Sequence, residues 1–472
     1  MRLESDAGQG ADLREEGAAT RVENELIDGG RAAEESRAAL EPGSPEPPHW
    51  KLVTRVAFRF CFSYFTLYSL SNQIFGGLFF IPKVDIPDPG TLWPMRQITF
   101  WAAKHIFRVT YELVYKDSGS GDKTFDWVQA FCLLVIALVV TAVWSLLDRR
   151  RENYAAMYKW FRLFIRFVLA SEMFLYGFDK LIPLQMPFPY LTRFVEPYGN
   201  FPPMSVLWWS IGASPAYEIF AGSAEVLGGV LLLLPVTTTL GALVSLADLI
   251  EVFMLNMTYD VPVKLFSFHL ILLALFLLAP EFARLAKFFF TNRATTPGRQ
   301  WNLFRTSRAN RIALVAQAVF ALYLAGVNIY QGVHAWHEYG GGRPKPALYG
   351  IWNIEQMSID GTVRPPLLTD SDRWRRAIFD FTDRTSFQRM DETFANYVSS
   401  IDEKAKTLAL TKRDDQKWSA KLTFERPALE RLLLDGTMDG RKIHAELKLV
   451  DRSQFMLVSR GFHWISEYPF QR

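Results

Sequence analysis

Long apolar stretches follow one another through the middle of the chain, and their length is the first feature that predicts structure. A helix needs about 20 predominantly apolar residues to cross the hydrocarbon core of a bilayer. Seven stretches approach or reach this length, at 56–74, 125–147, 158–176, 215–234, 238–257, 263–279 and 312–333. The pattern therefore predicts a polytopic α-helical membrane protein with about seven transmembrane helices.

The pattern changes on both sides of these stretches. Residues 1–50 are rich in acidic residues, alanine and glycine and show no apolar period, which predicts a disordered acidic tail. Beyond residue 342, short alternating runs and Asp-Gly pairs at Asp360, Asp435 and Asp439 are typical of strands and hairpin turns. Strands are predicted at 349–359, 374–381, 405–411, 418–424, 429–434, 442–450 and 454–459. Together they predict a C-terminal soluble antiparallel β-barrel or β-sandwich.

A further amphipathic segment is predicted at 93–115. Aromatic residues at helical spacing, among them Trp93 and Trp101, oppose Arg96 and Lys104. Such a helix is expected to lie along the outer membrane interface. The chain thus divides into a tail at 1–50, two transmembrane helices with an interfacial helix at 51–157, a four-helix membrane unit at 158–290, a basic loop with the seventh helix at 291–342, and a β-rich domain at 343–472.

Lysine and arginine gather in three of the connections, and their placement predicts the orientation. The clusters are Arg55 and Arg59; Arg149, Arg150, Arg151, Lys159 and Arg162; and Arg284, Lys287, Arg293, Arg299, Arg305, Arg308 and Arg311. With seven spans all three clusters fall on one side, and basic connections favour the cytoplasm. The N-terminus is therefore expected to be cytoplasmic and the β-rich domain extracytoplasmic.

Composition supports membrane residence and argues against other classes. Apolar residues make up 50% of the chain and charged residues 21%, below the roughly 25% of soluble domains. The net charge of +3 is nearly balanced, so no nucleic-acid partner is indicated. Cys61 and Cys132 are far apart, and His334, His337 and His269 do not form matched pairs, so the pattern predicts no metal site.

The third to sixth predicted spans carry ionisable residues, and these are the candidate functional residues. A charge at the centre of a bilayer costs roughly 2.5–3.5 kcal/mol, so it must face protein or water. The predicted site comprises Glu172, Asp179, Lys180, Glu218, Glu225, Asp248, Glu251, Lys264 and His269. Residues in the third span recur at helical spacing, which gives the helix one polar stripe. We expect the stripes to converge on an outward-facing cavity, with 185–189, Trp208 and Trp209 either covering its mouth or forming an interfacial aromatic belt.

Two interpretations of this cluster stay open. In the first, the excess of carboxyl groups over amines marks a cavity that handles protons or a ligand. In the second, Lys180 and Lys264 pair with Glu225, Asp248 or Asp260 and only fix the packing of the helices. The second interpretation leaves several carboxyl groups unexplained.

Two motifs among these residues resemble the DoxX-like membrane proteins. Tyr176-Gly-Phe-Asp-Lys180-Leu is similar to the Gly-x-x-Lys-Leu of that family's first helix, and Ala221-Gly-Ser-Ala-Glu225-Val-Leu-Gly-Gly229 is similar to the Gly-x-x-Glu-x-x-Gly-Gly of its second helix. The resemblance covers about a quarter of the chain, and Lys180 and Glu225 carry over by position. It implies a protein of the bacterial inner membrane, with relatives such as the DoxD subunit of thiosulfate:quinone oxidoreductase.

The resemblance and the charge cluster lead to one expected function and one alternative. The expected function is a DoxX-like component of a membrane redox or quinone-associated system, in which Glu172, Lys180, Glu225 and Asp248 line the cavity. No redox centre is encoded, so a bound quinone or a redox partner protein would carry the electrons. The alternative is a non-enzymatic binding or assembly protein whose external β-rich domain recognises a ligand or an envelope partner.

Overall fold

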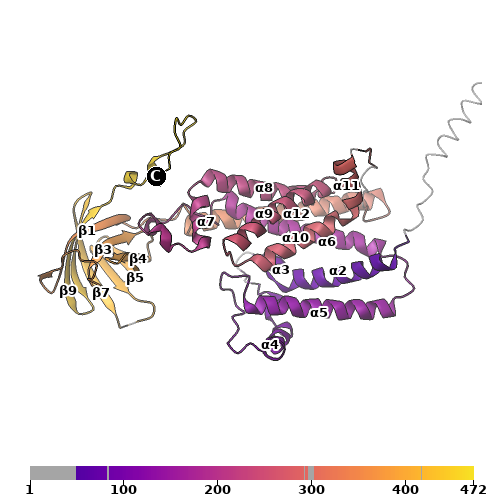
Figure 1. Ribbon diagram of the computed structural model, residues 1–472, viewed down its shortest axis with the longest axis horizontal. Helices are drawn as coiled ribbons and strands as arrows, with labels where there is room; N and C mark the ends of the chain where they lie inside the picture. Colours follow the sequence, from indigo (N-terminus) through magenta and orange to yellow (C-terminus); the bar gives the residue numbers. More distant parts are fainter. Residues whose placement is uncertain are drawn as a thin grey trace, which may run out of the picture.

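The computed structural model describes residues 49–81, 84, 86–291, 293–295, 302–415 and 417–471, which form an elongated helical bundle with a β-barrel at one end (Figure 1). Of the predicted disordered tail, residues 1–48 lie outside the described residues, and so does Arg299 of the third basic cluster. The C-terminal segment lies between the barrel and the bundle in the same view.

Each of the seven predicted apolar stretches coincides with a long helix. These helices are α2 (Leu52–Ser71), α5 (Thr124–Leu147), α6 (Ala155–Leu181), α8 (Pro215–Leu233), α9 (Thr238–Thr258), α10 (Lys264–Leu278) and α12 (Ser307–Glu338). Shorter helices are α3 (Gln73–Leu78), α4 (Met95–His105), α7 (Pro203–Gly212), α11 (Phe282–Thr291) and α13 (Met456–Ser459), with 3-10 turns at Pro89–Thr91, Leu191–Phe194, Tyr198–Asn200, Ala279–Glu281 and Arg452–Gln454. The helical part of the predicted fold class is therefore confirmed.

Five helical segments in the described part of the chain are long and apolar enough to cross a membrane. They are α5, α8, α9, the continuous stretch Lys264–Thr291 formed by α10 and α11, and α12. The predicted count was about seven, and the two helices that fall short are α2 and α6. Helix α6 carries several charges and packs against α8, α10 and α12, so its polar side chains face protein. Ionisable residues are tolerated in a membrane helix where they face protein rather than lipid.

Buried arginines close one end of the bundle. Arg162 donates to the carbonyl oxygen of Leu277 at 2.5 Å, and Arg166 donates to that of Leu232 at 2.9 Å. The last four carbonyls of a helix have no partner within the helix. The guanidinium groups of α6 therefore satisfy the C-terminal ends of α8 and α10.

The predicted basic clusters meet at this same end of the bundle, away from the barrel (Figure 1). Arg55 of the first cluster donates to the carbonyl oxygen of Arg151 in the second. Lys159 of the second donates to the carbonyl oxygen of Asn302, in the connection that carries the third. The connections that carry the described members of the three clusters therefore share one end of the bundle, whereas their location on one side of a membrane stays a prediction.

The predicted amphipathic helix is shorter than its pattern indicated. Helix α4 ends at His105, and residues 106–115 are not helical. Its buried Ala102 and Ala103 pack with Phe125 of α5, while Trp101 is exposed. Figure 1 shows α4 nearly end-on beside α5, so the two helices cross at a steep angle.

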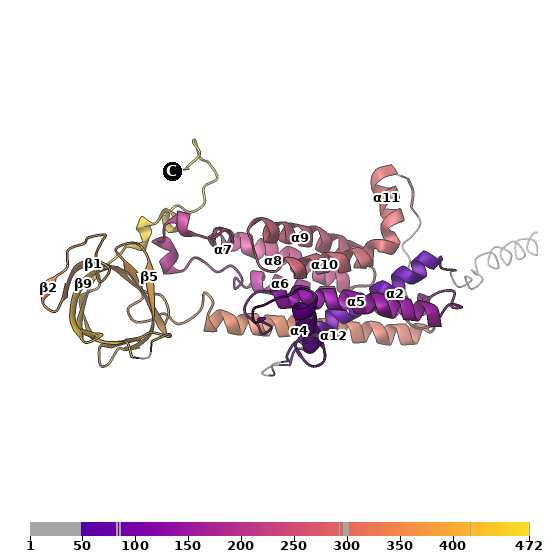
Figure 2. The ribbon, with the colours of Figure 1, turned by 60° about the horizontal axis from the view of Figure 1, so that its bottom comes forward.

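The C-terminal domain is an eight-stranded antiparallel β-barrel (Figure 2). Its strands are β1 (Gly350–Ile359), β3 (Trp374–Phe379), β4 (Arg384–Arg389), β5 (Phe394–Asp402), β6 (Thr407–Thr411), β7 (Ser419–Ala428), β8 (Arg431–Met438) and β9 (Arg441–Leu449). The short β2 (Thr362–Val363) pairs only with the end of β1. Pairing of β1 with β9, from Trp352 with Leu449 to Ile359 with Ile443, closes the meander. The barrel alternative of the prediction is thus confirmed over the sandwich.

Three details of the predicted strands were wrong. Strands β4 and β5 were missed, because β4 holds a single apolar residue, Phe387, and polar residues interrupt the apolar positions of β5. The predicted strand at 454–459 is instead a 3-10 turn followed by α13. Asp435-Gly436 lies within β8 rather than in a turn. There a Cβ on Gly436 would stand 2.2 Å from the carbonyl oxygen of Lys421, so glycine permits the close approach of β7.

Large apolar side chains fill the interior of the barrel. Trp352, Phe379 and Phe387 have no exposed surface, and the Trp352 indole donates to the carbonyl oxygen of Leu348. The inward positions alternate with exposed ones along β6 and β7. Side chains therefore fill this interior, and the outer surface of the barrel is the part available to an envelope partner.

The connection between α6 and α7 joins the bundle to the barrel. Leu191 is buried against Ile351 and Ile378 on the outside of the barrel. Its backbone N–H donates to Asp380 at 2.7 Å, and Arg343 donates to the same carboxylate at 2.6 Å. The barrel is therefore held against this connection by both apolar and polar contacts.

Candidate functional site

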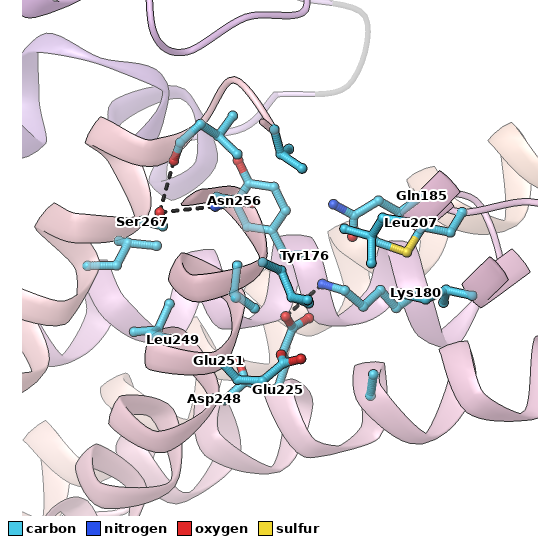
Figure 3. Close-up of a pocket in the computed structure, with 18 of the residues that line it drawn as sticks. Tyr176, Lys180, Gln185, Leu207, Glu225, Asp248, Leu249, Glu251, Asn256 and Ser267 are labelled. Atoms are coloured by element: carbon cyan, nitrogen blue, oxygen red, sulfur yellow. Dashed lines mark hydrogen bonds and ion pairs between the residues drawn. The ribbon is translucent and has the colours of Figure 1, made fainter. Parts of the chain in front are cut away.

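A cavity of about 100 Å³ lies among α6, α8, α9 and α10 (Figure 3). Gln185 and Met186 line it from the connection that touches the barrel, and Leu207 and Trp208 line it from α7. The cavity thus lies at the barrel end of the bundle. A cavity needs roughly 10–15 Å³ to hold one buried water, so this cavity has room for several waters or a small organic group.

Helix α6 presents its predicted polar stripe to this cavity. Glu172, Tyr176 and Lys180 lie at positions i, i+4 and i+8, and all three line the cavity. Residues at this spacing share one face of a helix. The predicted stripe also included Asp179, which does not line the cavity, so α6 contributes three of the four predicted residues to the wall.

The two motifs meet at an ion pair between α6 and α8. Lys180 Nζ lies 2.6 Å from Glu225 Oε1, and the two residues are 7% and 4% exposed. Gly222 permits this contact, because an added Cβ would stand 2.6 Å from the carbonyl oxygen of Gly177. Small residues let helix backbones approach closely. The glycines of the motifs thus place the charged residues of the motifs together.

Carboxyl groups outnumber amines around the cavity. Glu172, Glu225, Asp248 and Glu251 line it, whereas Lys180 is the one lysine or arginine among its lining residues. Glu172 Oε1, Glu225 Oε2 and Asp248 Oδ2 are buried and accept no hydrogen bond from any described residue. Buried polar atoms are nearly always hydrogen-bonded in native proteins. The unpartnered oxygens therefore indicate a site that something else completes.

The structure places four of the predicted site residues outside the cavity. Glu218 is fully buried and accepts from the backbone N–H of Met186 at 2.8 Å. Lys264 lies 2.9 Å from Asp260 and does not line the cavity. Asp179 and His269 are also absent from its walls. Helical spacing predicted which residues share a face, but it did not predict which parts of each face would surround the cavity.

Both ring nitrogens of His269 have hydrogen-bond partners in the core of the bundle. Its Nδ1 lies 2.7 Å from the carbonyl oxygen of Leu265, and its Nε2 lies 2.7 Å from Tyr64 Oη. A carbonyl only accepts, so Nδ1 carries the proton and neutral Nε2 accepts from the Tyr64 hydroxyl. The ring also stacks on Tyr68 with centroids 3.8 Å apart. Among the described residues, no group of three His, Cys, Asp or Glu side chains is placed to hold a metal ion.

Four polar residues at or near the cavity, Gln73, Tyr176, Asn256 and Ser267, were not in the predicted site. Gln73 of α3 donates to Tyr176 Oη at 2.8 Å and lies 3.5 Å from Glu172 Oε2. Asn256 lines the cavity and donates to Ser267 Oγ at 3.1 Å. The position of Tyr176 on the polar stripe of α6 could have predicted that it lines the cavity. Gln73 lies far away in the sequence and showed no pattern that pointed to α6.

Comparisons with known proteins identify one relevant relative. Part of the chain is 34% identical, over 118 residues, to the uncharacterised protein YwoB of Bacillus subtilis strain 168. The aligned part is 25% of this chain and 72% of YwoB. No protein-family model matches the chain. No solved structure matches it either.

Proposed function

We propose that this chain, which belongs to the same family as the uncharacterised protein YwoB, is a DoxX-like integral membrane protein whose acid-rich cavity binds a polar head group. The bound group would exchange protons with the carboxyl groups of the cavity, within a membrane redox or quinone-associated system. The chain itself encodes no redox centre, so a quinone and a redox partner protein would carry the electrons.

Membrane insertion is supported by the surface of the bundle. The five apolar helical segments have the length of a span, and α12 is mostly exposed although its side chains are largely apolar. Helices α2 and α6 would complete seven spans, with their polar residues turned toward the other helices. The positive-inside rule would then place the arginine-rich end in the cytoplasm of a bacterium and the barrel outside the inner membrane. The cavity would face outward.

The observation that carries the proposal is the surplus of carboxyl groups around one cavity. Four carboxyl groups share it with Lys180, and three of their buried oxygens lack partners. Ionisable residues within membrane helices are costly and are found where protons or ligands are handled. A head group that gains and loses protons, such as that of a quinone, would use both the Lys180 donor and the carboxyl acceptors.

Blocking the cavity tests this proposal. Ala221 lines the cavity from α8, whereas Ser223 of the same helix is exposed. We expect quinone to co-purify in roughly equimolar amount with the gently extracted wild-type protein and with Ser223→Trp, and to be lost from Ala221→Trp. Mass spectrometry of the extracted quinones provides the measurement. Equal quinone content in the two variants, or none above that of the bulk lipid, would contradict the proposal.

A non-enzymatic assembly role is the second candidate, and the ion pairs favour it. Lys180 pairs with Glu225 and Lys264 pairs with Asp260, as the packing interpretation predicts. In this case the outer surface of the barrel would bind an envelope partner. Cross-linking with the full chain distinguishes the candidates: a partner lost on Arg375→Glu at the barrel surface but retained by Ala221→Trp would favour assembly.

A further inference from the structure

The unpartnered atoms of the cavity share one chemical property. Glu172 Oε1, Glu225 Oε2 and Asp248 Oδ2 come from three different helices, α6, α8 and α9. Glu172 is 1% exposed and Glu225 is 4% exposed, so bulk water does not supply their partners. An ionised carboxylate is an acceptor only. What completes this site must therefore donate hydrogen bonds.

Two side-chain donors of the cavity already have an acceptor among the lining residues. The Lys180 ammonium donates to Glu225 Oε1, the other oxygen of that carboxylate. The Asn256 amide donates to Ser267. With Lys180 neutralising one of four carboxyl groups, the remaining partner is expected to carry positive charge as well as donor hydrogens.

An extended organic cation fits these atoms better than a single metal ion. A metal ion needs several ligands around one point, and no group of three acidic, His or Cys side chains in the described part of the chain offers them. Tyr176, Trp208, Tyr217 and Phe266 also line the cavity. Aromatic faces attract ammonium groups and cover the carbon atoms attached to them.

We propose that the cavity binds a small organic ligand through a protonated primary amine, whose N–H groups donate to Glu225 Oε2 and Asp248 Oδ2, with the Glu251 carboxylate beside them. The inference rests on the proposed function in taking this cavity as the ligand site, and it adds the charge and the donor character of the ligand. Figure 3 shows Glu225, Asp248 and Glu251 grouped on one side of the cavity, opposite Gln185 and Leu207. The amine would lie on the acidic side.

Matched small molecules test the inference on the full chain in phosphatidylcholine nanodiscs. Butylammonium and butan-1-ol have the same carbon chain, and tetramethylammonium has the charge without an N–H donor. We expect saturable binding of butylammonium by isothermal titration calorimetry, about tenfold weaker binding of tetramethylammonium, and none of butan-1-ol. Equal binding of butan-1-ol and butylammonium, or no binding of butylammonium, would overturn the inference.

Variants locate the bound amine. Asp248→Asn and Glu251→Gln each remove one carboxylate from the cavity, while Asp260→Asn removes an exposed carboxylate outside it. We expect butylammonium to bind about tenfold more weakly to either cavity variant and unchanged to Asp260→Asn. Glu251 is exposed, whereas Asp248 is partly buried. Glu251→Gln therefore keeps the test decisive if Asp248→Asn disturbs folding. Unchanged affinity in a folded cavity variant contradicts the assignment.

A titration with quinone distinguishes this inference from the proposed function. A short-chain benzoquinone is titrated into the same nanodiscs, alone and in competition with butylammonium. If the quinone binds and butylammonium does not, the amine inference fails and the proposed function stands. If butylammonium binds while quinone neither binds nor co-purifies, the amine inference stands and the quinone association fails.

Discussion

The bundle and the barrel place charge and apolar surface in opposite ways. In the bundle, Glu225 and Lys180 are buried, while apolar side chains such as Leu138 and Leu322 are exposed. In the barrel, Trp352 and Phe387 fill the interior. Its ion pairs, such as Arg375 with Glu392 and Arg441 with Asp372, lie at the surface.

This difference teaches that the two regions are organised for different surroundings. The barrel follows the rule of soluble proteins, in which apolar burial drives folding. The bundle has an apolar exterior, as expected beside lipid, where polar contacts between helices contribute to specificity. Substitutions in the interior of the bundle and of the barrel test this contrast.

The largest loss of stability is expected in the barrel. Phe387→Ala removes a fully buried ring that packs on Trp374 with centroids 4.1 Å apart. We expect a loss of about 3–5 kcal/mol in the free energy of unfolding of the barrel, because a cavity replaces the ring. Hydrogen exchange of β3 and β4 in the full chain measures it. Val398→Ala, at a more exposed position, is the control, and an equal loss there would contradict the comparison.

A loss of similar size but different origin is expected in the bundle. Lys180→Met leaves Glu225 buried without its cation, which typically costs about 3–5 kcal/mol. The double variant Lys180→Met, Glu225→Met replaces the pair by apolar groups and should recover most of this loss. Reversible denaturation in detergent compares the three proteins. A double variant less stable than Lys180→Met would show that unpaired charge is not the cause.

A smaller effect is expected where the two regions meet. Asp380→Ala removes the acceptor of both the Leu191 N–H and the Arg343 guanidinium. Hydrogen bonds to charged groups contribute about 1.5–3 kcal/mol, so the connection should open locally while both regions stay folded. Faster amide exchange at Leu191 is the expected signal. Asp383→Ala, an exposed neighbour, should leave this rate unchanged.

The smallest effect is expected at the barrel surface. The hydrogen bond from His444 to Asp435, 2.6 Å long, raises the pKa of the imidazole above its ordinary value of 6.5. The resulting stabilisation is present below pH 6.5 and is lost as the pH rises through the higher pKa of the folded state. Because His444 is partly exposed, it should amount to about 1 kcal/mol or less. Unfolding of the barrel between pH 5 and 9 measures it, and Asp435→Asn should reduce the dependence to the part that Glu446 contributes.

The sequence by itself determined the long helices and the two motifs. Apolar length predicted all seven helices to within a few residues at most ends, because a helix of this kind is specified by local composition. Helical spacing also predicted the stripe of Glu172, Tyr176 and Lys180, because positions four residues apart share a face in any α-helix. Asp-Gly turns predicted two hairpins, after Ile359 and after Met438.

The tertiary structure alone decided which charges meet. Packing of α6 on α8 brought Lys180 to Glu225 and left Lys264 and His269 outside the cavity. The same packing enclosed α6, which carries more Asp, Glu, Lys and Arg residues than any other of the seven long helices. Pairing of β1 with β9 closed the barrel across about 90 residues of chain. These outcomes depend on contacts between segments distant in sequence, and neither hydrophobic period nor turn chemistry carries that information.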